Sequence, residues 1–187
     1  WHELTSSEIR DYHHEIKIAG LEVCGLHSLF FDHPELSMFG SLEIKKQTSK
    51  FLLHLSKVCR DMGGKTLIFG SPSARNRHQL SKGNAFKQAC DFLSELCLKI
   101  EPHNTVLCVE PLSRQDSNFL NTVQESLCLV KTVKSPALKL QIDLRAMVAS
   151  NEITQSMVSD ISPFLCHVHV NASDLGILKA DDVRHCE

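Results

Sequence analysis

The sequence predicts an α/β fold built on parallel strands, and three observations lead to this prediction. Five short apolar segments alternate with longer amphipathic segments along the chain. No tight-turn signal joins two consecutive apolar segments into a long hairpin. Segments such as 105–109 are apolar on both alternating faces, which is typical of strands that are covered on both sides in a parallel sheet. Right-handed crossovers would then bring the carboxyl ends of all strands to one face.

The elements follow one another in a regular order. Apolar spacing predicts helices over residues 6–19, 40–62, 83–100, 122–133 and 153–165. Segments rich in β-forming residues predict strands over 21–31, 65–69, 105–109, 138–142 and 166–170. Gly20 and Gly63 are expected to end the first two helices, and Asn121 or Thr122 to cap the fourth. With no linker in sight, residues 1–187 are expected to form a single domain.

Composition and charge restrict the class of protein. The formal net charge is −2, with 20 basic and 22 acidic residues and no basic tract, which disfavours a nucleic-acid partner. No apolar run approaches the roughly 20 residues that cross a bilayer, and the first residues do not resemble a signal peptide. We therefore expect a cytoplasmic protein with no membrane partner. The 8 cysteines are scattered without a CxxC pair, so we expect small core residues rather than disulfides or a zinc knuckle.

Polar side chains stand at the carboxyl ends of three successive predicted strands. Glu110 follows the strand 105–109, Asp143 follows 138–142, and His169 lies in the segment 166–170. Since the carboxyl ends share one face, we expect these three side chains to meet. Two carboxylates and one imidazole suit a divalent ion such as Mn²⁺, Mg²⁺, Co²⁺ or Zn²⁺.

Each residue also has a simpler interpretation. Glu110 could be an ordinary loop carboxylate, Asp143 a helix cap, and His167 or His169 a packed core histidine. His27 lies near the end of the first predicted strand and is either a substrate contact or a packed histidine. In the polar loop 70–77, Arg75 and Arg77 could contact a phosphate, although a solvated pair of charges is the simpler expectation.

Five segments together resemble the xylose isomerase-like TIM barrels, a family of sugar isomerases and epimerases, inosose dehydratase-like proteins and endonuclease IV. The nearest branch is that of the ketose 3-epimerases and sugar phosphate isomerases/epimerases. The resemblance is carried by GLHSLFF at 25–31, FGSPSARNR at 69–77, VEPLSRQDSNFLNT at 109–122, IDLRAM at 142–147 and HVHVNASDL at 167–175.

This resemblance implies roles for particular residues. Glu110 would bind the metal and act as the catalytic acid/base, while Asp143 and His169 would complete the metal ligands. Arg114 and Asp116 match a loop that shapes the sugar site, where the epimerases usually have Glu in place of Asp116. The substrate-binding set is then His27, His167, Arg114 and Asp116.

The chain also departs from the family pattern. Ala146 and Ala172 stand where the family commonly has a histidine and an acidic residue. A complete barrel needs eight strands and roughly 250 residues, whereas this chain is expected to supply strands three to seven of an incomplete barrel. The second catalytic glutamate, expected on the eighth strand, has no counterpart in it. Open sheet edges and an uncovered inner face would then favour association, so a homo-oligomer is one expectation.

The resemblance implies a metal-dependent isomerase or epimerase acting on a keto sugar or sugar phosphate, by proton abstraction next to a carbonyl. With one catalytic glutamate, we expect weak metal binding and little turnover. Three alternatives remain open: an inosose dehydratase-like lyase that uses the same site, a non-catalytic barrel module, and, least favoured, an endonuclease IV-like DNA repair enzyme.

Overall fold

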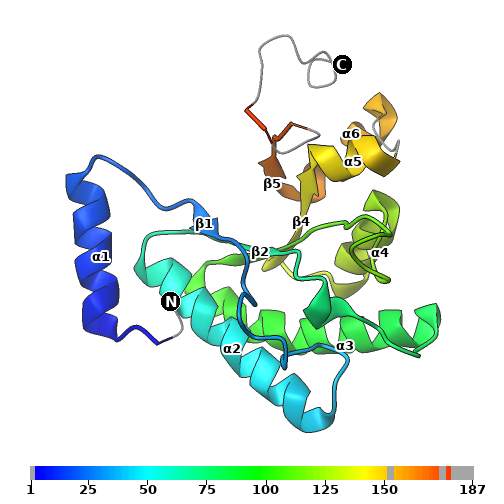
Figure 1. The fold of residues 1–187 in the computed structure, drawn as a ribbon, viewed down its shortest axis with the longest axis horizontal. Coiled ribbons are helices and arrows are strands. Elements are labelled where there is room, and N and C mark those ends of the chain that lie inside the picture. The colour runs from blue at the N-terminus through cyan, green and yellow to red at the C-terminus, as the bar shows by residue number, and fades with distance from the viewer. Residues whose placement is uncertain (1–2, 151–153, 173–175, 178–187) are drawn as a thin grey trace.

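Five parallel strands form one curled sheet, the wall of a half-barrel (Figure 1). The computed structural model describes residues 3–150, 154–172 and 176–177. The strands pair strictly in chain order, each one parallel to the next. They are β1 (Gly25–Leu26), β2 (Thr66–Phe69), β3 (Val106–Val109), β4 (Leu138–Asp143) and β5 (Leu165–His169). The predicted α/β fold with parallel strands, arranged as an incomplete TIM barrel, is confirmed.

The helices are α1 (Ser6–Ile18), α2 (Leu42–Asp61), α3 (Lys82–Ile100), α4 (Val123–Val133), α5 (Leu144–Ser150) and α6 (Gln155–Ile161). α1 precedes the first strand and lies to one side, next to α2, and the other helices follow the strands, with α2, α3 and α4 covering one face of the sheet (Figure 1). Five of the helices begin behind a hydroxyl side chain that accepts a hydrogen bond from the backbone N–H three residues later: Thr5, Ser41, Ser81, Thr122 and Thr154. The cap of α4 is therefore Thr122 and not Asn121.

The prediction of a long first strand over 21–31 is wrong. Only Gly25 and Leu26 pair with β2, and the chain then turns. Ser28 and Asp32 adopt positive φ angles of 54° and 61°, which a strand cannot hold. Between them, Leu29 and Phe30 turn into the core instead of continuing the sheet. A run of β-forming residues thus serves here as a turn that buries two of its apolar side chains.

The region between β4 and β5 also differs from the prediction. One helix was expected over 153–165, of which residue 153 lies outside the described residues. The structure has two short helices, α5 directly after β4 and then α6, which ends at Ile161. A 3₁₀ turn over Ser162–Phe164 follows, with proline in its first turn, because proline cannot continue an α-helix from within.

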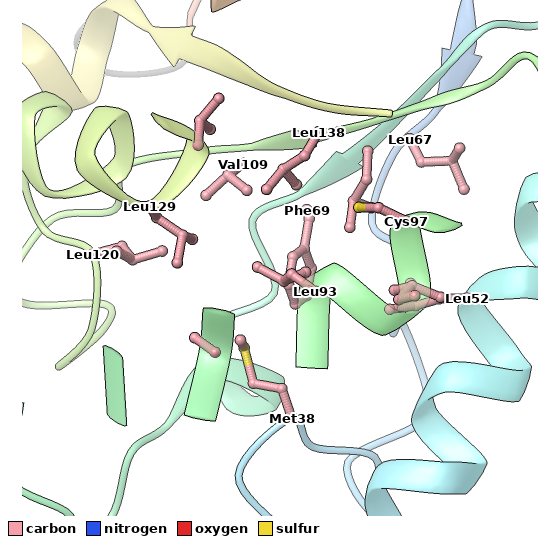
Figure 2. Packing of buried hydrophobic residues seen from close by; sticks show 14 of the residues in the cluster. Met38, Leu52, Leu67, Phe69, Leu93, Cys97, Val109, Leu120, Leu129 and Leu138 are labelled. Atoms are coloured by element: carbon pink, nitrogen blue, oxygen red, sulfur yellow. The ribbon is translucent and has the colours of Figure 1, made fainter. Parts of the chain in front are cut away.

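The principal core lies between the sheet and helices α2, α3 and α4 (Figure 2). Strand residues such as Leu67, Phe69 and Val109 meet Leu52 and Leu93 from the helices. Ile68 and Cys108 are buried as well but do not belong to this cluster, because alternate strand residues point to the opposite face. The helices therefore secure the outer face, and the inner face is left to the functional side chains.

Leu93 offers a direct test of this core. Its side chain is 0% exposed on α3, whereas Leu98 on the same helix is 70% exposed. Leu93→Ala is expected to lower the free energy of unfolding by about 3 kcal/mol, through lost burial and the cavity left behind. Leu98→Ala is the matched control and should change it by less than about 0.5 kcal/mol. Urea denaturation measures both, and equal effects would contradict the packing described.

The cysteines only partly follow the expectation of a core role. Cys59, Cys97 and Cys108 are buried, but Cys24, Cys128 and Cys166 are exposed: Cys24 lies in the segment before β1, and the other two face solvent from α4 and β5. All the cysteines among the described residues are free thiols; Cys186 lies outside that part of the chain. Within the same residues, no helix combines the length and apolarity needed to cross a bilayer.

Candidate metal centre

Glu110, Asp143 and His169 meet at the carboxyl ends of β3, β4 and β5. Each offers one ligand atom, and the three atoms lie within 4.8 Å of one another. The shortest separation between an Asp143 oxygen and a His169 nitrogen, Oδ2 to Nδ1, is 3.8 Å. The parallel pairing of β4 with β5, which sets Asp143 opposite His169, produces this proximity. The expected convergence of the three side chains is thus present in the structure.

Asp143 is held by a neighbour in the chain and by a residue just after β5. Its Oδ1 accepts a hydrogen bond from the backbone N–H of Ala146 at 3.2 Å, so Asp143 also starts α5. Its Oδ2 accepts one from Asn171 Nδ2 at 2.9 Å. The helix-cap role and the place in the cluster are therefore compatible, since each uses a different oxygen. Such outer partners fix the orientation of a ligating carboxylate.

Glu110 is 7% exposed, and its surroundings favour the protonated acid. Burial, followed by the nearby Asp143 carboxylate, raises the pKa of Glu110 to about 7 from its usual 4.5, against the opposite effects of Arg75 and Gln141. Gly70 makes room for this side chain: a Cβ there would lie 2.3 Å from Glu110 Oε2. The carboxylate is thereby set close to the backbone at the end of β2.

The rings of His27 and His167 both contact the ring of His169. The ring centroids of His27 and His169 lie 5.2 Å apart, and those of His167 and His169 lie 4.9 Å apart, both edge to face. Burial, and then the two neighbouring histidines, lower the pKa of His169. The neutral imidazole is the form that ligates metals, so these contacts favour a ligand role.

A cleft of about 320 Å³ opens beside Glu110. Its walls come from the ends of β1, β2 and β3: His27, Ser28, Phe30, Phe31, Ile68, Gly70, Ser71, Pro72, Ser73, Glu110 and Leu112. Polar and aromatic groups thus face a space large enough for a small polar molecule. His27 lines this cleft as well as contacting His169, so the structure places it at the site.

Arg114 and Asp116 lie elsewhere on the loop after β3. Both are exposed, and neither lines the cleft. Asp116 Oδ2 accepts a hydrogen bond of 2.7 Å from Ser113 Oγ, and its backbone N–H donates to the Ser113 carbonyl. In this structure Asp116 therefore closes its own turn. Of the four residues expected to contact substrate, the structure brings His27 and His167 to the cluster and leaves the loop pair outside.

The expectation that Arg75 and Arg77 form a solvated pair is wrong. Arg75 is 0% exposed, and its Nη1 donates to the Glu110 carbonyl oxygen at 2.8 Å. Burial lowers its pKa to about 10, which still leaves the guanidinium charged. Arg77 donates to the carbonyl oxygens of Asn118 and Leu80. Both arginines fasten backbone segments, because loop carbonyls need donors that the sheet does not supply.

Sequence reasoning assigned no role to Gln141, Gly70 or Asn171. Gln141 is 0% exposed, and its Nε2 lies 2.9 Å from His169 Nδ1. Its position on β4, two residues before Asp143 and so on the same face of the strand, was the available signal. Gly70 and Asn171 carried no such signal, because their roles depend on contacts with other strands.

The three residues fit a divalent ion. Two carboxylates and a neutral imidazole converge from three different strands, and buried Arg75 and the hydrogen bonds to Asp143 hold them in place. This donor set is one that Mn²⁺, Mg²⁺, Co²⁺ and Zn²⁺ accept. Without an ion, burial and the nearby Asp143 carboxylate favour a proton on Glu110, which relieves the repulsion that a cation would otherwise relieve.

Solved structures with the same fold include several sugar epimerases. A D-psicose 3-epimerase crystallised with D-fructose has a TM-score of 0.78 and 15% identity, covering 92% of this chain and 60% of its own. The D-psicose 3-epimerase of Clostridium cellulolyticum H10 with D-tagatose has a TM-score of 0.79 and 16% identity, with coverages of 97% and 64%. A 3-keto-D-glucoside 4-epimerase from E. coli has a TM-score of 0.74 and 18% identity, with coverages of 90% and 66%.

These comparisons establish the fold and the family. The chain spans about 60% of the length of the first of these epimerases, and identities below 20% concern the fold alone. No curated protein matches the sequence significantly. The family model described as xylose isomerase-like TIM barrel, however, matches residues 1–185. The chain therefore belongs to the xylose isomerase-like TIM barrel family.

Proposed function

We propose that this protein binds a divalent metal ion through Glu110, Asp143 and His169 and abstracts a proton next to the carbonyl of a keto sugar or sugar phosphate. The observation that supports the proposal best is the convergence of the three ligand atoms within 4.8 Å at the mouth of the half-barrel. Active sites of TIM barrels lie at this face. The structural neighbours include sugar epimerases, which agrees with this substrate class.

Each residue then has a defined task. Glu110, Asp143 and His169 would hold the divalent ion, which would supply Lewis acidity to polarise the substrate carbonyl. Glu110 takes the proton from the adjacent carbon as the general base. His27 and the polar wall of the cleft orient the sugar. Arg75 holds the Glu110 backbone in place through the hydrogen bond from its Nη1 to the Glu110 carbonyl oxygen.

Proton exchange is the sharpest test, because it needs one base whereas epimerisation needs two. We expect the purified chain with Mg²⁺ or Mn²⁺ to exchange a carbon-bound hydrogen of a ketose for deuterium in D₂O, and to form little epimer. Mass spectrometry of a panel of ketoses, ketose phosphates and inososes detects the exchange, and loss of water from an inosose would reveal the lyase reaction. Glu110→Gln should abolish exchange.

Two controls test whether the loss of exchange is specific to Glu110 and whether exchange depends on the metal. Glu95 is an exposed carboxylate on α3, so Glu95→Gln is the matched variant and should retain exchange. Chelation with EDTA should stop exchange in the wild type. Exchange that survives in Glu110→Gln would contradict the role of Glu110. Metal binding without any exchange over the panel would favour a non-catalytic barrel module.

A further inference from the structure

Gln141 is a buried polar side chain in the middle of the proposed metal site. It lies on β4, two residues before Asp143 and therefore on the same face. Of the neighbouring strands, β3 is followed directly by Glu110 and β5 ends at His169. Its Nε2 donates to the Ile142 carbonyl at 3.2 Å and lies 2.9 Å from His169 Nδ1. Its Oε1 is buried and has no hydrogen-bond partner among the described residues.

The 2.9 Å contact bears on which atom of His169 is free for a metal. An N–H of Gln141 that points at Nδ1 must use the Nδ1 lone pair, which a metal would otherwise take. Nδ1 is also the His169 atom that faces Asp143, with 3.8 Å to Oδ2. Adjacent and opposite ligands of an ion with bonds of about 2.1 Å are separated by roughly 3.0 to 4.2 Å. The Asp143–His169 separation fits two ligands of one ion, and the Gln141 amide lies beside the second of them.

We propose that Gln141 is a fourth ligand of this ion, through its amide oxygen. Rotation of the amide by about 180° exchanges its oxygen and nitrogen with little change of shape. Oε1 then occupies the place of Nε2, 2.9 Å from His169 Nδ1, which is close to the separation of adjacent octahedral ligands. Amide oxygens are ordinary ligands of hard divalent ions. This inference rests on the proposed metal site and adds one ligand to it.

The rotation has a cost that a bond to the metal would offset. Gln141 gives up its hydrogen bond to the Ile142 carbonyl and the favourable contact of its N–H with the Glu110 carboxylate. It also leaves a buried N–H unpartnered in place of the buried carbonyl oxygen. In return, the N–H that competes for His169 Nδ1 is removed. Gln141 Oε1, which has no hydrogen-bond partner among the described residues in the metal-free state, would thus gain a partner in the bound ion.

The number of water molecules on bound Mn²⁺ tests the proposal, because a lost protein ligand is replaced by water. Water-proton relaxivity reports that number, and calorimetry reports the affinity. We expect Gln141→Leu to bind Mn²⁺ about tenfold more weakly and to carry one more water molecule on the ion. Gln141→Glu keeps an oxygen at this position and adds charge, so it should bind about tenfold more tightly with the water count of the wild type. Gln124→Leu, exposed on α4, is the matched control.

Each result has a defined meaning. Weaker binding by Gln141→Leu with an unchanged water count would overturn the ligand role and leave Gln141 as a residue that orients His169. If Gln141→Leu retains no metal, Gln141→Glu decides: tighter binding with the wild-type water count supports the proposal, and weaker binding overturns it. Failure of the wild type to bind Mn²⁺ overturns both this inference and the proposed function. Wild-type binding that Asp143→Asn abolishes retains the proposed function, whatever Gln141 does.

Discussion

Glu110→Gln is expected to remove a pH dependence of about 3 kcal/mol from the stability of the metal-free protein. The pKa of Glu110 is about 7 in the folded state, against 4.5 for an ordinary glutamate. Between these values the folded state holds a proton that the unfolded chain has released, so the free energy of unfolding falls as the pH rises from about 4.5 to 7. Each unit of pKa difference contributes about 1.4 kcal/mol.

Chemical denaturation at several pH values between about 4 and 8 measures this difference. The glutamine variant carries no titrating proton, so its stability relative to the wild type should rise across the window and stay constant above it. Glu95→Gln, at an exposed site, should follow the wild-type profile at all pH values. Parallel profiles for the wild type and Glu110→Gln would show that the folded protein does not retain the Glu110 proton.

Asp143→Asn is expected to weaken Mn²⁺ binding at least about a hundredfold while leaving the metal-free fold intact. The substitution removes an anionic ligand, and the loss of even an outer-shell partner typically costs tenfold to a hundredfold in metal affinity. The fold should tolerate the change because asparagine can still accept the hydrogen bond from the Ala146 N–H that starts α5. Calorimetric titration with Mn²⁺, after removal of bound metal, gives the affinity.

A second exposed carboxylate provides the comparison. Asp160 is exposed on α6, so Asp160→Asn makes the same chemical change away from the cluster and should bind Mn²⁺ like the wild type. Thermal unfolding of the metal-free variants tests the fold separately. Equal Mn²⁺ affinities for Asp143→Asn and the wild type would remove Asp143 from the ligand set and leave it only the role of a helix cap.

Much of the fold and the three-residue cluster could be predicted because they follow from local periodicity. The apolar run Val106–Val109 and the amphipathic pattern of Leu42–Asp61 each specify their own element. Alternation along a strand sets the face of each residue, and parallel pairing sets the end at which its polar group emerges. Glu110, Asp143 and His169 could thus be expected to meet before any contact was known.

Local sequence patterns gave wrong predictions where a contact between distant residues determined the conformation. The segment 21–31 has the composition of a strand, yet burial of Leu29 and Phe30 draws it into a turn. Arg75 is charged and stands in a polar loop, yet its guanidinium is buried because the Glu110 carbonyl and the Phe69 ring lie beside it. The residues next to these positions in the sequence predict neither outcome.

The sequence by itself determined the alternation of strands and helices, the parallel sheet and the side chains at its carboxyl edge, because each depends on a period of a few residues. Only the tertiary structure decided which further groups join them. Gln141, Gly70 and Arg75 reach the cluster through contacts between strands or between loop and strand. Such contacts depend on the register and curvature of the whole sheet, which no short stretch of sequence specifies.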